Sequence, residues 1–401
     1  MSDIELSKSS KNRVFAIFLA LYPILCIYKA FGNFTIGDVV LIGFIVVETI
    51  KGRTFKNIFP MFIIYGIYIL TSQMLDFSFA EDYNITSQIN AAIIRAIKIL
   101  FYIFAIVCLA GSRICNFFTL RRWLIIVGLA TSIFMFYQYI MFFGFGKVVL
   151  GQIPGLEIYL KEYTTDNLDY EAFYNYTFRP CSLFLEPAML AQFMIVPIAM
   201  LLFSTDEISR KKLYLIIFTL ATILSTSGQG VLYLSMVYAI FSFVFTKNKL
   251  LSIMIALSIA LIGAIGYEFI EPLSSAVDRL VTGEEAQESR FGTYEYCFDL
   301  EAWRMLFGNG YGCTHDGLYM AGAAYVWYGA GIIGLFCAIL LFVQVYIKCK
   351  PILSRALTLL FFAMLWGTAL FYNYMFFWFF TIIIVVAYPF VVDSKKKIKH
   401  A

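Results

Sequence analysis

Residues 321–347 read AGAAYVWYGAGIIGLFCAILLFVQVYI and contain no charged side chain. About 20 consecutive apolar residues are enough for a helix to cross the hydrocarbon core of a bilayer. This stretch is therefore long enough to span a membrane. It decides the fold class, because it makes lipid the solvent for much of the chain.

The composition of the whole chain supports the same conclusion. Of its 401 residues, 61% are hydrophobic and 14% are charged, whereas soluble domains have roughly 45–50% and about 25%. The mean hydropathy is +0.81. No soluble core could hide this much apolar surface from water. A soluble enzyme, a disordered regulator and a disulfide-stapled secreted domain are therefore excluded.

The hydropathy pattern predicts an all-α, polytopic membrane protein with about 12 transmembrane helices, forming one integral-membrane domain over residues 1–401. The predicted spans lie near residues 14–31, 35–50, 58–75, 91–110, 123–143, 182–203, 213–228, 230–246, 250–267, 321–347, 356–372 and 374–392. A polar stretch, STSGQG at 225–230, separates the seventh span from the eighth. We expect a tight turn there, because Gly and Ser give the backbone the freedom that a turn needs.

The distribution of basic residues predicts the orientation. With the N-terminus in the cytoplasm and the spans alternating, most of the 30 Lys and Arg residues fall on the cytoplasmic side, as the positive-inside rule requires. Both termini are then cytoplasmic, and two long extracytoplasmic loops cover residues 144–181 and 268–320. Both loops are rich in Asp, Glu and Tyr. The simpler interpretation is a solvated outer surface, and the alternative is a surface that binds a hydroxyl-rich ligand.

Cysteine and histidine usage argues against a structural metal site. The eight cysteines form no C-x-x-C pair and the chain has two histidines, whereas a structural zinc site needs about four N or S ligands at short spacing. Several of the cysteines lie inside apolar runs and are interpreted as small core residues. Cys297 and Cys313 could pair if they face an oxidising compartment.

Three basic residues lie inside predicted spans, where a charge costs at least roughly 2.5–3.5 kcal/mol. They are Lys29, Arg95 and Lys98. Arg95 and Lys98 are three residues apart, so they share one face of a helix near its outer end. Lys98 can extend to the headgroups. Arg95 either contacts a substrate or pairs with an acidic residue.

A charged pair flanks the start of the sixth span, in FRPCSLFLEP at 178–187. Pro180 and Pro187 interrupt regular helix there, and we expect Glu186 to lie about one turn inside the span. Arg179 and Glu186 form either a structural pair or a site that faces the outer solvent.

The second long loop carries WRMLFGNGYG at 303–312, and CTHDGLY follows at 313–319. The three glycines of the first stretch allow a tight backbone path with exposed amides, which can hold a diphosphate. His315 is the only histidine outside the C-terminal tail. Asp316 beside it can orient the imidazole, so His315 is a candidate general base; a structural role is the alternative.

Several of these stretches resemble the O-antigen polymerase and O-antigen ligase superfamily of bacterial cell-envelope glycosyltransferases. RPCSLFLEP at 179–187 is similar to the family pattern Arg-x-x-(Ser/Gly)-x-Phe-x-Glu-Pro at the start of a middle span. Arg290, Trp303 and LFGNGYG at 306–312 resemble part of the family's large periplasmic loop.

The resemblance covers roughly residues 175–345 and includes two departures. HDGLY at 315–319, followed by GAGIIGL at 329–335, is similar to the family pattern H-N-x-y-l…G-x-x-G-l, with Asp316 in place of Asn. The turn at 225–230 lies where the family has T-x-S-R-G, but the arginine is missing. The order and spacing of the motifs carry the likeness, because each is weak alone.

The resemblance implies a glycosyltransferase of the C type in the bacterial inner (cytoplasmic) membrane. It would polymerise oligosaccharide repeat units linked to undecaprenyl diphosphate, on the periplasmic face. Its partners would be the lipid-linked donor and acceptor, membrane lipids, a chain-length regulator and a flippase. Neither nucleic acid nor a cofactor or metal is implied.

The implied site residues fall into two groups. The catalytic group is His315, Glu186 and Arg290, with His315 or Glu186 as the base. The group that binds the diphosphate or the glycan is Arg95, Arg179, Arg304, Asp316, Tyr311 and Tyr319. Arginine suits this task, because its planar donors stabilise the departing diphosphate.

Three alternatives remain open. A ligase would transfer the glycan to lipid A-core, although the missing arginine at 225–230 favours a polymerase. A transporter or flippase would use Arg95 and Glu186 as substrate contacts, but it should show two matching halves with broken helices, and the hydropathy shows no such repeat. A non-catalytic scaffold is the third.

Overall fold

The computed structural model describes residues 13–55, 59–74, 85–110, 114–159, 180–204, 208–225, 227–245, 292–315, 320–368, 371 and 373–398. These residues are mostly helical. A helix occupies every predicted span that falls in these ranges, and the predicted span at 250–267 lies outside them. Among the described residues, four helices are long and apolar enough to cross a membrane: α5, α6, α10 and α16. The described part of the chain is thus consistent with an all-α membrane protein.

The chain divides into two compact units, each built from two separate stretches. Unit 1 contains Met1–Ile42 and Cys115–Val281, and unit 2 contains Gly43–Ile114 and Thr282–Ala401. Helix α3 (Ile36–Ile50) carries the chain from the first unit to the second. The single domain predicted for residues 1–401 stays a prediction.

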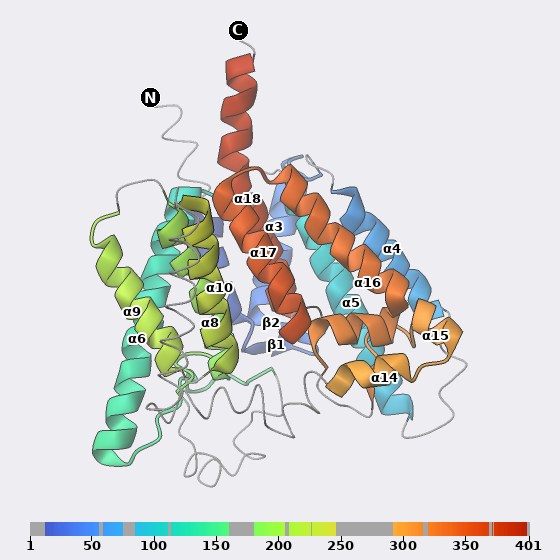
Figure 1. Cartoon of the computed structure of the whole chain (residues 1–401), viewed down its shortest axis with the longest axis horizontal. Helices are drawn as coiled ribbons and strands as arrows, with labels where there is room; N and C mark the ends of the chain where they lie inside the picture. Colours follow the sequence, from blue (N-terminus) through green and yellow to red (C-terminus); the bar gives the residue numbers. More distant parts are fainter. Residues whose placement is uncertain are drawn as a thin grey trace. The chain divides into compact units, whose positions relative to one another are not determined.

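Unit 1 is built around one buried helix. The helices described within it are α2 (Arg13–Leu25), α6 (Phe117–Phe145), α8 (Pro187–Phe203), α9 (Lys211–Leu224) and α10 (Gly228–Phe245). Every residue of α8 from Leu190 to Phe203 is buried, because α6, α9 and α10 pack around it (Figure 1). The turn predicted at 225–230 is shorter than expected, since α10 already begins at Gly228.

A small hairpin follows α2 in unit 1. Strand β1 (Lys29–Phe31) pairs antiparallel with β2 (Phe34–Thr35). Lys29 Nζ forms an ion pair with Glu157 Oε1 at 2.6 Å. The prediction that Lys29 lies inside a span is wrong, because the first helix ends at Leu25 and the chain then turns into this hairpin.

In unit 2 five helices pack in a closed ring. They are α4 (Pro60–Met74), α5 (Ile85–Leu109), α18 (Tyr374–Ile398), α17 (Ile352–Gly367) and α16 (Gly322–Lys348), each of which contacts the next, with α16 returning to α4 (Figure 1). Aromatic rings fill the centre: Phe361 and Phe380 have centroids 4.8 Å apart, and Phe62 lies 5.0 Å from Phe380. Such edge-to-face pairs add to the energy of burial.

Helix α16, the stretch that decides the fold class, is broken. Gly331 has φ 68° and ψ 179°, which no helical residue adopts, so α16 consists of two helices joined by a kink. The carbonyl of Ala330, at the break, accepts a hydrogen bond from Tyr68 Oη at 2.7 Å. The uncharged run is therefore not one straight span.

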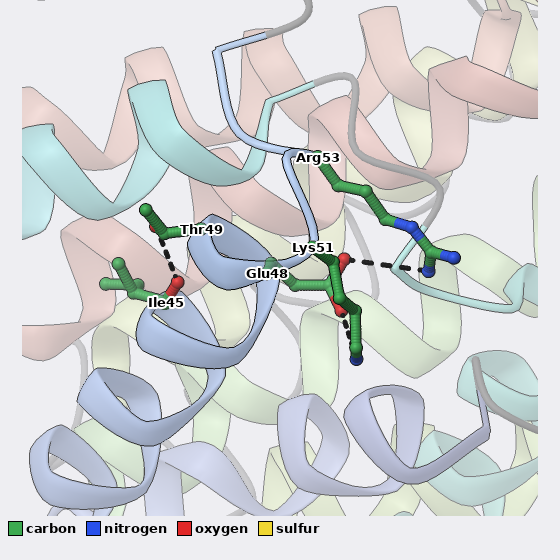
Figure 2. Close-up of polar contacts among 5 residues, drawn as sticks. All are labelled: Ile45, Glu48, Thr49, Lys51 and Arg53. Atoms are coloured by element: carbon green, nitrogen blue, oxygen red, sulfur yellow. Dashed lines mark hydrogen bonds and ion pairs between the residues drawn. The ribbon is translucent and has the colours of Figure 1, made fainter.

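The C-terminal end of α3 in unit 2 holds a buried carboxylate. Gly52 has φ 61°, and its N–H donates to Thr49 O while Arg53 N–H donates to Glu48 O, which is the usual glycine-terminated helix end. Figure 2 shows Lys51 and Arg53 extending to the Glu48 side chain, with N–O distances of 3.0 and 3.9 Å. Both cations also offset the negative end of the helix dipole.

The two ends of unit 2 differ in character. At one end, Phe55 N donates to Cys108 O at 3.3 Å, and Lys348 Nζ lies 4.8 Å from the centre of the Phe59 ring. This end therefore holds the basic residues that follow α3 and end α16. At the other end, Gln73 of α4 donates to Tyr311 O.

The described part of the second long loop is folded. It forms η3 (Gly292–Tyr294), α14 (Glu295–Phe298) and α15 (Ala302–Phe307), and both α14 and α15 pack against α16. The thiol of Cys297 donates to Ala324 O at 3.5 Å. Cys297 and Cys313 form no disulfide, so the pairing considered from the sequence does not occur in this structure.

Candidate functional site

The loop 308–315 follows α15 and is fixed to two helices of unit 2. Arg95 of α5 donates from Nη1 to Gly312 O at 2.9 Å. Gln73 of α4 donates from Nε2 to Tyr311 O. A charged donor on a carbonyl is stronger than a neutral one. The structure thus places Arg95 against the same loop that carries His315.

Three glycines allow this loop to pass close to its neighbours. Gly308, Gly310 and Gly312 have φ values of 85°, 96° and 103°, a region that other residues rarely adopt. A Cβ at Gly312 would lie 2.5 Å from Ala92 O, and one at Gly308 would overlap the Gly329 carbonyl. The predicted tight backbone path is therefore present, and close packing against α5 and α16 is its cause.

Two amides of this loop are occupied by carbonyls of the protein and are not exposed. Gly308 N donates to Arg304 O at 2.6 Å, and Asn309 N donates to Tyr328 O at 3.0 Å. Residues 308–312 are buried. The prediction that these amides cradle a diphosphate is therefore wrong for both, because protein carbonyls already occupy them.

Tyr311 is a core residue rather than a ligand contact. Its ring is fully buried and lies edge-on to Tyr65 and Tyr325, with centroids 6.4 and 5.5 Å away. Its hydroxyl donates to Phe371 O. Burial raises the pKa of Tyr311 well above its ordinary value, and the neighbouring Tyr65 adds to this. The glycan-binding role expected for Tyr311 has no exposed atom to support it.

His315 lies in an aromatic setting. Its ring stacks on Tyr296 of α14, with centroids 4.1 Å apart and planes 18° from parallel. It also lies edge-on to Tyr328 of α16 at 6.1 Å. These two rings fix the plane of the half-buried imidazole from two sides, which is what a proton-transfer group needs.

The sequence did not single out Tyr296 or Tyr328. Both tyrosines belong to stretches rich in other aromatic residues, and only the folding of α14 against α16 brings them to His315. The weak signal was Tyr328 itself, which directly precedes Gly329 in the motif at 329–335.

Asn309 is a third residue that the sequence did not single out. It is 7% exposed, and among the described residues no group donates a hydrogen bond to its Oδ1. A buried acceptor left without a donor costs about 1–3 kcal/mol. Asn309 belongs to the loop 308–315, which also carries the candidate base His315, and its N–H donates to Tyr328 O.

Arg304 of α15 contacts the neighbouring Trp303 ring. Its guanidinium lies 5.3 Å from the centre of the Trp303 ring, and the Trp303 indole N–H donates to Glu301 Oε2 at 2.8 Å. Arg304 is half-buried and belongs to the same folded segment as the loop 308–315.

Glu186 belongs to unit 1. It is half-buried and stands directly before α8 with extended backbone, and Pro187 is the first helical residue. The prediction that Glu186 lies a turn inside the helix is wrong, because the helix begins five residues later than expected. Glu186 and His315 are thus placed by different units.

The segment before Glu186 is tightly fixed in unit 1. Ser182 has a positive φ of 54° and is fully buried. Its N–H donates to Gln138 Oε1 at 2.8 Å, and its hydroxyl donates to Thr131 O at 2.6 Å. These bonds stabilise a backbone conformation that costs non-glycine residues of order 1 kcal/mol.

The remaining predicted site residues are Arg179, Arg290, Asp316 and Tyr319, and all four lie outside the described residues. Within the described ranges, no three His, Cys, Asp or Glu side chains are grouped to hold a metal ion. In the described part of the chain, Arg95 contacts the loop 308–315 at Gly312, and His315 of the same loop contacts the unpredicted Tyr296 and Tyr328.

Comparison with models of known protein families finds no match for this chain, and no curated protein matches it either.

Proposed function

We propose that this chain is a multi-pass glycosyltransferase of the bacterial inner membrane. It would polymerise oligosaccharide repeat units linked to undecaprenyl diphosphate, on the extracytoplasmic side. The observation that carries the proposal is one loop that holds both a candidate base and a cation: His315 stacked on Tyr296, and Arg95 bound to Gly312 O.

The position of this loop within unit 2 supports the extracytoplasmic side. The loop lies at the end where α4 finishes, and the opposite end carries Lys51, Arg53 and Lys348. Basic residues concentrate on the cytoplasmic side of membrane proteins. With that end in the cytoplasm, the loop faces outward, and the twelve spans with both termini inside remain part of the proposal.

The proposed chemistry is one substitution at the anomeric carbon of the donor. The bond from that carbon to the diphosphate oxygen breaks, and the lipid diphosphate leaves with the electron pair. The acceptor hydroxyl oxygen forms the new glycosidic bond, and its proton moves to the His315 imidazole. Arginine stabilises the negative charge that develops on the leaving oxygens. No cofactor is needed.

The test uses purified full-length protein in proteoliposomes with a synthetic lipid-diphosphate-linked repeat unit. A ladder of longer lipid-linked glycans is expected from the parent. His315→Ala should slow its formation by about 10²–10⁴-fold, the usual contribution of a positioned base. The matched control is His400→Ala, which removes the only other histidine and should leave the ladder unchanged.

Arg95 gives a second, graded test in the same assay. Arg95→Ala should abolish the ladder, whereas Arg95→Lys should recover part of it, because an ammonium can still donate to Gly312 O but cannot form a bidentate contact.

Other products would contradict the polymerase. Transfer of the glycan to added lipid A-core, with no ladder, indicates a ligase. Movement of the lipid-linked sugar across the bilayer without any new glycosidic bond indicates a transporter. Full activity of His315→Ala rejects the histidine as the base, and Glu186→Gln is then the variant to assay.

A further inference from the structure

The short helices of the second long loop expose large apolar side chains. Phe298 is 63% exposed, Leu306 46% and Phe307 39%. On α15, Trp303, Leu306 and Phe307 share one face, because residues three and four apart on a helix are neighbours. A loop surrounded by water should not gather such residues on one surface.

The packing of α15 fixes its depth relative to α16. A Cβ at Gly331 would overlap the Leu306 carbonyl, and it would lie 2.5 Å from Phe307 N. The end of α15 therefore touches α16 at its break. It does not lie beyond the N-terminal end of α16 at Gly322.

An exposed apolar stripe on α16 begins at this same level. Ile332 is 40% exposed, Phe336 58% and Ile347 63%, and their spacing places them on one side of the helix after the break. This helix, 332–348, is the part of α16 that would cross the hydrocarbon core. Leu306 and Phe307 thus lie at the level where this apolar stripe begins.

Indole and phenol groups surround the same surface. Phe298 packs edge-on against Trp327 with centroids 4.9 Å apart, and Tyr294 Oη donates to Trp366 O at 3.1 Å. Trp366 is itself 38% exposed. Trp and Tyr are the side chains that concentrate at lipid–water interfaces, where an apolar ring and a polar tip are both satisfied.

We propose that η3, α14 and α15 (292–307) lie in the lipid–water interface at this end of unit 2. Phe298, Leu306 and Phe307 then contact the acyl chains of phospholipids. The exposed carboxylate of Asp299 stays on the water side, and it opposes binding of anionic headgroups. The partner is therefore the acyl–glycerol region of a zwitterionic bilayer, and the inference does not depend on the proposed reaction.

The test is nitroxide accessibility in full-length protein reconstituted into phosphatidylcholine nanodiscs. The half-buried native cysteines Cys115, Cys313 and Cys337 are first replaced by serine. Single cysteines are then introduced by Phe307→Cys, Phe336→Cys and Asp299→Cys and are spin-labelled. Phe336 is the lipid reference and Asp299 the water reference.

The expected result is that the label at 307 resembles the label at 336, with collision by oxygen favoured over collision by a water-soluble nickel complex. The label at 299 should show the reverse preference. A label at 307 that behaves like the one at 299 overturns the proposal. Water accessibility at 336 overturns it too, because the lipid surface that begins at the level of α15 would then be absent.

A second measurement covers the case in which a label disturbs α15. The double variant Leu306→Ser, Phe307→Ser is reconstituted into lipid vesicles. After mild carbonate washing, almost as much of this variant as of the parent should be recovered with the lipid. The variant should, however, show markedly reduced quenching of tryptophan fluorescence by lipids brominated near the glycerol. Quenching equal to that of the parent would show that Leu306 and Phe307 do not hold this segment in the interface, and it would overturn the proposal.

Discussion

Asn309 has a buried acceptor to which no described group donates, and it belongs to the same loop as the candidate base His315. If a ligand hydroxyl or N–H donates to this acceptor, Asn309 serves ligand binding at a cost to the stability of the free protein. Asn309→Leu, of similar shape, should then raise Tm by roughly 1–4 °C, since about 1–3 kcal/mol of desolvation cost is removed. The same variant should lower turnover in the ladder assay.

The control for this prediction is Asn309→Asp, which keeps an oxygen acceptor at the same place. It should retain more turnover than Asn309→Leu. A lower Tm with normal turnover for the leucine variant would show that Asn309 has only a structural role.

Cys297 makes the stability of unit 2 sensitive to alkali. Burial raises the pKa of this thiol from 9.0 to about 12. Between these values the unfolded chain loses the thiol proton and the folded chain keeps it. The stability contributed by the neutral thiol is thus complete below pH 9 and is lost as pH rises toward 12, by at most about 1.4 kcal/mol per pH unit.

The measurement is Tm in detergent at a series of pH values from 8 upward. Cys297→Ala should lower Tm near neutral pH but give a shallower decline above pH 9 than the parent shows. Ser354→Ala is the matched control, because it removes a buried hydroxyl that does not titrate in this range, and it should leave the slope unchanged. Equal slopes for parent and Cys297→Ala would contradict the assignment.

Among the secondary-structure elements, the break in α16 is the feature whose stability should be most sensitive to a single substitution. Gly331→Ala places a Cβ into the Leu306 carbonyl at a positive φ, so we expect a loss of several kcal/mol of stability. Gly43→Ala in α3 is the control, because no atom lies within 4 Å of its Cβ. The control should be neutral or stabilise by about 0.5–1 kcal/mol.

Both variants are compared by expression level and by the midpoint of thermal aggregation in detergent. Similar behaviour of Gly331→Ala and Gly43→Ala would mean that α15 does not pack on α16 in the way described.

The sequence predicted the helices well and the break in α16 not at all. Apolar segments such as 123–143 were identifiable because lipid requires long uncharged runs whose backbone is satisfied internally. The break was hidden because Gly329, Gly331 and Gly334 are compatible with a transmembrane helix. Gly331 has non-helical dihedral angles because the Leu306 carbonyl of α15 packs against it, and this contact cannot be read from the sequence of α16.

The site was predicted in part for a similar reason. Arg95 and His315 stood out because a charge in a span and a lone histidine are rare in this chain. Tyr296 and Asn309 did not, since their roles arise from contacts between α14, α16 and the loop 308–315. Tyr311 was misassigned because a motif cannot show whether a tyrosine faces solvent or the core.

For the whole molecule, the testable property is which end of unit 2 faces outward. Glu301 and Lys350 are both exposed and belong to the segments at its opposite ends. In spheroplasts, a membrane-impermeant maleimide should label Glu301→Cys at once. Lys350→Cys should react only after the membrane is permeabilised, and the parent gives the background. The reverse pattern would contradict the proposed orientation.

The kink at Gly331 also relates this protein to the thickness of its bilayer. The helix 332–348 is about 25 Å long at roughly 1.5 Å per residue, whereas the hydrocarbon core of a typical bilayer is about 30 Å thick. This mismatch favours local thinning of the membrane around α16. Lipids with shorter acyl chains should then reduce this mismatch. The acyl-chain length of the surrounding membrane should therefore change the depth at which α15 and the attached loop 308–315 lie.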